Sequence, residues 1–305
     1  MRIFIQIVVI LCTLLAFGAA KLHSEDQLHR DMVAQRLLQP PLKEGTSLQL
    51  GQTGAAVALG GLRSLIAAVW NLRAFLYFED LDWIKLEKSY EVITTLQPQT
   101  THYWITGAWH LHTNASVHYK EAPELSSFRR SALQRLYIKK GSDVLEEGVK
   151  QNPDNWKLHD ALARVWSDPF KLPDLARSLR HYDDLLACDT IPAYRRNMFE
   201  RFCFYTLCRI PSRRADALKE GVKLYQASAK NHTPSLVNYL FALQNELNIP
   251  AEDRIPESAL YSSKKQQLRW LKNLWNRRDQ DFPVSGVRAK IEQLERENES
   301  PEGSH

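Results

Sequence analysis

Hydrophobic side chains recur every three or four residues through most of the chain, which is the spacing of one face of an α-helix. Two such faces follow one another before Pro98. Because a proline ends a helix, the two faces predict two consecutive helices that end before Pro98 and form a hairpin of about 34 residues. Alternation with period two is almost absent, so we predict an all-α fold. The two faces consist of Trp70, Ala74 and Tyr77, followed by Leu86, Tyr90 and Ile93.

The pattern of the first hairpin returns 34 positions later in the chain. Trp104 follows Trp70 at this interval and Ala108 follows Ala74, with Gly107 beside it. A small residue lets a neighbouring helix approach closely, while aromatic side chains fill the space between hairpins. The spacing therefore predicts that antiparallel hairpins are repeated along the chain.

Helix-start signals and hydrophobic stripes predict further helices towards the C-terminus. Asn155 is a predicted N-cap for a helix that runs from Trp156 to Trp166. Thr233 and Pro234 form a second start, with proline at the first helical position. The stripes predict the remaining helices at about 174–188, 192–209, 212–230, 262–278 and 284–297.

These spacings resemble the tetratricopeptide (TPR) repeat, whose first helix carries a Trp, a small pair and a Tyr, and whose second helix ends shortly before a Pro. Arg73 and Leu86 depart from that pattern, since the family usually has a Leu and a small residue there. The resemblance implies a TPR-like α-solenoid of antiparallel helix hairpins with a concave groove. The stretch from Leu59 to Asn114 is also similar to membrane-anchored bacterial proteins with divergent TPR repeats, which implies an envelope assembly role and no reaction.

The N-terminal segment is apolar enough to cross or enter a membrane. Between Ile3 and Ala20 the polar side chains are Gln6, Cys12 and Thr13, which leaves about 18 residues to span the bilayer core. An uncleaved signal anchor is one interpretation. A removed signal peptide is the alternative, because small residues precede position 21. Arg2 predicts a cytoplasmic N-terminus, and so places the bulk of the chain on the periplasmic side of a bacterial inner membrane.

The sequence divides into five predicted regions. These are a signal anchor or signal peptide (1–20), a polar tether (21–50), a TPR-like helical repeat domain (51–250), C-terminal capping helices (251–298) and a disordered tail (299–305).

Composition narrows the function classes. The mean hydropathy of -0.39 excludes a polytopic membrane protein. A net charge of +5 is spread over 40 basic and 35 acidic residues, and the basic doublets are dispersed. We therefore expect no nucleic-acid partner.

Candidate chemistry is sparse. His110 and His112 invite a metal interpretation, but on a helix two residues two positions apart point about 200° from each other. The carboxylates at 79–82 suit a helix start, and Cys188, Cys203 and Cys208 suit buried positions. The sequence therefore predicts no catalytic residue, no cofactor and no metal site.

In a TPR-like array the first helix of each hairpin lines the groove, and side chains opposite the packing stripe point into it. Aromatic residues with nearby polar groups suit an extended peptide or a partner helix. In the alternative interpretation Phe75, Phe78 and Trp109 are core residues covered by residues 60–68. The predicted groove residues are Asn71, Phe75, Phe78 and Glu79 in the first hairpin, and His102, Trp109 and His112 in the second.

The anchor and the repeat predict a non-enzymatic, membrane-anchored protein-interaction scaffold in an envelope assembly or secretion system. Its partners are a protein or peptide in the groove and the membrane through residues 3–20. One alternative is an envelope enzyme, for example a glycan-processing one, with its site on a helical array. Another is a scaffold that faces the cytosol, which free cysteines permit. A deep pocket with a carboxylate of raised pKa favours the enzyme.

Overall fold

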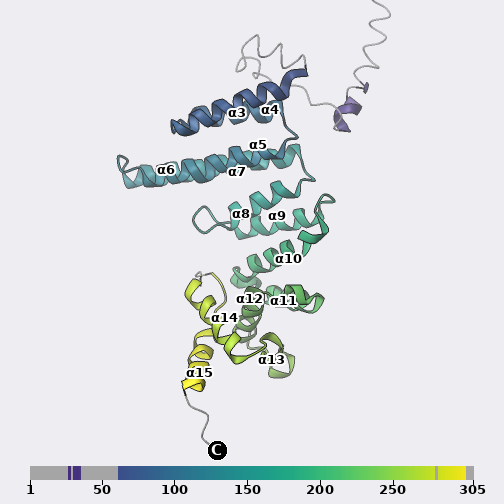
Figure 1. Cartoon of the computed structure of the whole chain (residues 1–305), viewed down its shortest axis with the longest axis vertical. Coiled ribbons are helices and arrows are strands. Elements are labelled where there is room, and N and C mark those ends of the chain that lie inside the picture. Colours follow the sequence, from purple (N-terminus) through teal and green to yellow (C-terminus); the bar gives the residue numbers. More distant parts are fainter. Residues whose placement is uncertain (1–26, 29, 36–60, 279–280, 300–305) are drawn as a thin grey trace, which may run out of the picture. The chain divides into compact units, whose positions relative to one another are not determined.

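The computed structural model describes residues 27–28, 30–35, 61–278 and 281–299 (Figure 1). Over these residues the regular structure is helical and contains no strand, which confirms the all-α prediction. The apolar segment 3–20, most of the tether and the tail from residue 300 lie outside the described residues. Among the helices that are described, none combines the length and the apolar character needed to span a bilayer.

Contacts within the chain define two compact units, one that ends at Gly107 and one that begins at Ala108. In the first unit, α3 (Arg63–Glu79) and α4 (Trp83–Leu96) form the predicted hairpin, and α5 (Thr101–Trp109) begins after it. The turn between α3 and α4 contains Leu81 in the left-handed region, with φ of 57°. Asp82 then caps α4, because its carboxylate accepts a hydrogen bond from the Lys85 N–H at 3.0 Å.

The core of the first unit comes mainly from α4. Trp83, Leu86 and Ile93 are almost completely buried there, whereas α3 contributes the small residues Ala67 and Ala74. Leu86 is therefore a large buried side chain at a position where the TPR pattern has a small residue. The small side chains on α3 leave room for the large buried side chains of α4.

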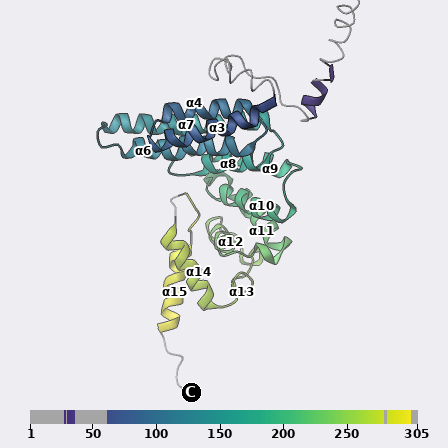
Figure 2. The same ribbon diagram turned by 45° about the horizontal axis from the view of Figure 1, so that its top comes forward.

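The second unit is a succession of helices in which sequence neighbours pack on one another. A π-helical turn, η2 (His110–Ala115), follows α5 directly. In Figures 1 and 2 the last two helices, α14 and α15, lie side by side. The α-helices after η2 are α6 (Ser116–Glu121), α7 (Ser127–Gln151), α8 (Trp156–Ser167), α9 (Leu175–Ala187), α10 (Ala193–Cys208), α11 (Arg214–Ala227), α12 (Pro234–Glu246), α13 (Glu257–Leu260), α14 (Lys264–Arg277) and α15 (Val287–Glu299).

Local signals account for where these helices start. The Asn155 side chain accepts from the Lys157 N–H at 3.1 Å, and the Thr233 hydroxyl accepts from the Leu236 N–H at 3.4 Å. Pro234 occupies the first turn of α12 as predicted. The five ranges predicted from hydrophobic stripes correspond to α9, α10, α11, α14 and α15.

Helix lengths differ between the hairpins. The helices α3 and α4 have 17 and 14 residues, but α7 has 25. From Thr101 to Glu121 the chain stays helical through η2, because no proline interrupts it before Pro123. The interval of 34 positions seen in the sequence therefore does not fix the length of the later helices.

Buried clusters among the described residues join the later helices of the second unit. One surrounds Phe199 between α8, α9 and α10. Another joins α10, α11 and α12 to the C-terminal helices and includes Phe204, Leu240 and Leu271. The cysteines Cys188, Cys203 and Cys208 are all free and buried, as predicted.

Candidate functional site

The predicted groove residues of α3 lie along the margin between its buried and its exposed side. Phe75 is 57% exposed, whereas Asn71 and Phe78 are half-buried. The Asn71 side-chain oxygen Oδ1 accepts a hydrogen bond from the Tyr90 hydroxyl at 3.5 Å. The ring of Phe78 meets Trp83 edge-on, with ring centroids 6.0 Å apart. Asn71 and Phe78 therefore contact α4, while Phe75 is open to solvent.

A larger apolar surface continues from Phe75 around the exposed side of α3. Its residues are spaced by three and four positions, so they project in similar directions at about 100° per residue. Glu79 is exposed at the end of the same side. We name this surface the α3 stripe; it consists of Leu65 (59% exposed), Val69 (47%), Leu72 (70%), Phe75 (57%) and Leu76 (57%).

Four of the five stripe residues were not among the residues predicted to bind a partner. The interval pattern Leu65, Val69, Leu72, Leu76 is visible in the sequence and repeats like the seam of a coiled coil. The helix therefore has a second apolar face besides the one formed by Trp70, Ala74 and Tyr77. Periodicity alone does not say which of two apolar faces is buried.

The predicted groove residues of the second hairpin lie in different environments. His102, in the first unit, is exposed and lies within hydrogen-bonding distance of the Thr106 hydroxyl, at 3.3 Å. In the second unit Trp109 is 46% exposed, but His112 is only 7% exposed. Burial, aided by the positive charge of Lys171, lowers the pKa of His112 to about 3. His112 is thus a neutral buried side chain and does not line an open surface.

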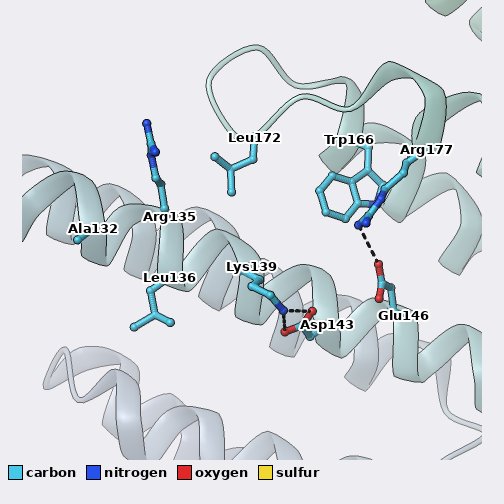
Figure 3. Close-up of a pocket in the computed structure, with 9 residues that line it drawn as sticks. All are labelled: Ala132, Arg135, Leu136, Lys139, Asp143, Glu146, Trp166, Leu172 and Arg177. Atoms are coloured by element: carbon cyan, nitrogen blue, oxygen red, sulfur yellow. Dashed lines mark hydrogen bonds and ion pairs between the residues drawn. The ribbon is translucent and has the colours of Figure 1, made fainter.

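An open cleft of about 540 Å³ lies in the second unit between α7 and the segment from α8 to α9 (Figure 3). The guanidinium of Arg177 stacks over the Trp166 ring, 4.8 Å from its centroid, and pairs with Glu146 at 3.7 Å. Lys139 pairs with Asp143 on the α7 side at 2.6 Å. These charged side chains are already paired with one another, and one wall of the cleft is aromatic. This lining suits a peptide better than a small ligand with a single charge.

A second cleft, of about 380 Å³, contains a carboxylate next to a thiol. The Cys203 thiol donates to the Asp183 carboxylate at 3.8 Å. Partial loss of solvent around the Asp183 carboxylate raises its pKa above its ordinary value although the residue is not enclosed, and burial together with the charge of Asp183 raises the pKa of Cys203 to about 12. A thiol in this state is a poor nucleophile at neutral pH. Asp183 itself is exposed.

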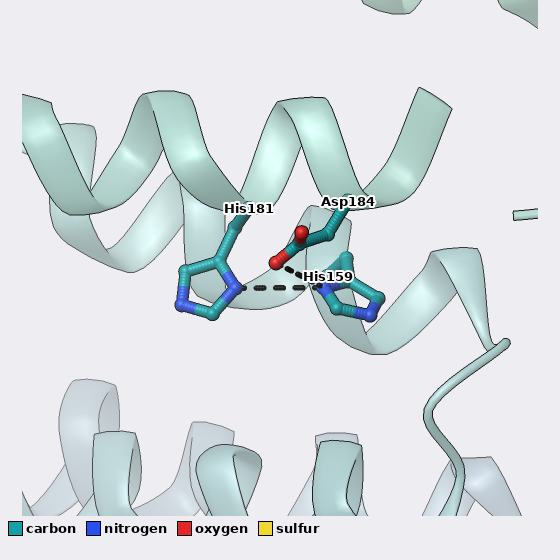
Figure 4. Close-up of side chains that lie close together, drawn as sticks. All are labelled: His159, His181 and Asp184. Carbon is teal, nitrogen blue, oxygen red and sulfur yellow. Dashed lines mark hydrogen bonds and ion pairs between the residues drawn. The ribbon is translucent and has the colours of Figure 1, made fainter. Parts of the chain in front are cut away.

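Three side chains that no motif had indicated come together between α8 and α9 (Figure 4). His159 is buried on α8, while His181 and Asp184 lie one turn apart on α9. The two histidine Nδ1 atoms are 3.4 Å apart, and an Asp184 carboxylate oxygen is 3.8 Å from the His159 Nδ1. Burial, with a contribution from His159, lowers the pKa of His181 to about 4.

No protein-family model matches the chain, and no curated protein matches it in sequence.

Proposed function

We propose that the chain is a non-enzymatic protein-interaction scaffold, built as a TPR-like α-solenoid and anchored in a membrane through residues 3–20, which binds an amphipathic helix of a protein partner on the α3 stripe. The observation that carries this proposal is the exposure of the stripe, from 47% to 70% over its five large hydrophobic side chains. Packing between sequence neighbours in the second unit supports the solenoid part of the proposal.

The spacing of the stripe argues for a helical partner. Hydrophobic residues at intervals of three and four project along one line of the helix, and a second amphipathic helix presents knobs at the same intervals. Soluble monomers rarely expose a contiguous apolar patch of this kind without a binding role. Leu72 at the centre and Phe75 at the edge are the strongest anchor candidates, being 70% and 57% exposed.

The stripe has a polar boundary that limits where a partner helix can lie. Arg73 follows Leu72 on the helix, and its guanidinium stacks on Trp70 at 5.5 Å from the ring centroid. Glu79 marks the C-terminal end. A partner helix with an acidic residue near Arg73 and a basic residue near Glu79 fits this arrangement, since opposite charges at the rim fix orientation.

The location in the cell envelope and the role in assembly or secretion rest on the apolar segment 3–20, which lies outside the described residues. The envelope enzyme is the second candidate function, and the cleft at Asp183 is the observation that favours it, because a carboxylate with a raised pKa lies there. The raised pKa of Cys203 in the same cleft argues against covalent catalysis by that thiol.

Site-specific photo-cross-linking tests the scaffold proposal. A photoreactive residue replaces Leu72 in the full-length chain in its native membrane, and cross-linked peptides are identified by mass spectrometry. We expect cross-links to one protein, at positions spaced by three, four and seven residues on a single helical face. A Leu65→Asp, Phe75→Asp double variant should abolish them.

Phe128→Asp is the matched control, because Phe128 is 81% exposed on α7 and lies outside the stripe. It should leave the cross-links unchanged. Cross-links that remain in the double variant, that scatter over many proteins, or that join Leu72 to residues 36–60 of the same chain would each overturn the proposal.

A further inference from the structure

The cluster of His159, His181 and Asp184 shares no residue with the α3 stripe. Its three side chains come from two helices that pack on each other, α8 and α9. One nitrogen from each histidine and one carboxylate oxygen lie within 4.8 Å of one another. Both residue types, histidine and aspartate, are ligands of zinc-like divalent ions.

A hydrogen bond fixes which nitrogen of His159 faces the cluster. Its Nε2 lies 3.0 Å from the Pro153 carbonyl oxygen, which only accepts, so Nε2 carries the hydrogen. In the neutral imidazole the Nδ1 then has a free lone pair, and it points towards His181 and Asp184 (Figure 4). An N–H donated to a backbone carbonyl is the usual outer contact of a metal-bound histidine.

Two of the three separations between ligand atoms are close to those around a tetrahedral ion, and the third lies within 4.8 Å. Bonds of about 2.0 to 2.1 Å place neighbouring ligand atoms about 3.3 Å apart. The observed separations are 3.4 Å between the two Nδ1 atoms and 3.8 Å from the His159 Nδ1 to Asp184. Without a cation or a shared proton, a lone pair and a carboxylate oxygen would face each other.

We propose that the Nδ1 atoms of His159 and His181 and a carboxylate oxygen of Asp184 bind a divalent transition-metal ion of the zinc class. His159 is the rigid ligand, since its side chain is only 6% exposed, whereas the Asp184 side chain is 59% exposed and leaves one side of the site open to water. The bound ion has three protein ligands and a water molecule. It joins α8 to α9 across the hairpin.

Sequence spacing gave no sign of this site. His159 and His181 are separated by 22 positions, and only His181 and Asp184 share a helix. The ligands converge because the Asn155 cap sets the start of α8 and the loop after Trp166 turns the chain back into α9.

Titration with Co²⁺, a spectroscopic substitute for Zn²⁺, tests the proposal on the full-length chain in detergent after removal of metal by a chelator. We expect one equivalent to give the visible absorption of a four-coordinate ion, and Zn²⁺ to displace it. His181→Gln and Asp184→Asn should each weaken binding at least about tenfold. His102→Gln, at an exposed histidine outside the cluster, is the matched control and should bind as the wild type does.

Thermal unfolding gives a second readout. Zn²⁺ should raise the unfolding midpoint of the wild type and of His102→Gln, but not that of His181→Gln, because an ion that binds only the folded state stabilises it. Metal-free variants with wild-type circular dichroism establish that the substitutions leave the fold intact. Absence of the Co²⁺ signal in the wild type, or an unchanged signal in both cluster variants, would overturn the proposal and leave a proton-bridged histidine pair.

Discussion

Gly141 on α7 lies directly against His112 in η2. A Cβ atom added to Gly141 would come within 2.6 Å of the His112 Cβ and 2.7 Å of the Ala108 carbonyl oxygen. Both neighbours are close to the helix backbone, which does not move aside as the end of a flexible side chain would. The contact between α7 and η2 therefore depends on a position without a side chain.

Gly141→Ala should destabilise the protein. Within an isolated helix the substitution favours folding by up to about 1 kcal/mol. Here the added methyl group overpacks the contact with η2, and we expect a net loss of about 1 to 3 kcal/mol in the free energy of unfolding. Urea unfolding followed by circular dichroism measures the difference.

Ser131→Ala on the exposed side of α7 provides the control for helix propensity, and its effect should stay within about 0.5 kcal/mol. If Gly141→Ala proved as stable as the wild type or more stable, the close contact between α7 and η2 would be wrong.

His112 should make stability depend on pH. Its pKa is about 3 in the folded chain, against an ordinary value of 6.5, mainly because burial disfavours the charged imidazole. Between these two values the unfolded chain binds a proton that the folded chain does not. The free energy of unfolding therefore falls as pH is lowered from about 6.5 towards about 3, by at most about 1.4 kcal/mol per pH unit for this one group.

A His112→Asn variant isolates this contribution. The difference in unfolding free energy between wild type and variant should be constant above pH 7.5 and should change in favour of the variant as pH drops below about 6.5. Urea unfolding at a series of pH values tests this. Parallel curves for the two proteins across pH 4 to 7 would show that His112 titrates in the folded chain as it does in the unfolded one.

Local signals in the sequence were sufficient for helix positions, but contacts between distant segments were not predictable. The caps at Asn155 and Thr233 act within three residues of themselves, so a single sequence reveals them. The π-helical turn at His110 to Ala115 has no such signal. His112, which the TPR-like projection had placed in a groove, lies in this turn and is buried.

The same distinction explains what was missed at the candidate sites. The α3 stripe and the opposite face at Ala74 are both apolar, and only the tertiary contacts with α4 decide which is covered. The ligands His159 and His181 come from separate helices, so no spacing rule connects them.

Shortening a leucine should reduce stability much more in the buried core of the first hairpin than on the exposed α3 stripe. Leu86 on α4 is 0% exposed, and Leu86→Ala should cost about 2 to 5 kcal/mol, the range for a buried leucine that leaves a cavity. Leu72 on α3 is 70% exposed, so Leu72→Ala removes little buried area and should change stability by less than about 0.5 kcal/mol. Urea unfolding of both variants of the full-length chain measures these losses. A loss at Leu72 comparable to that at Leu86 would mean that the stripe is already covered within the protein, and that it is not available to a partner helix.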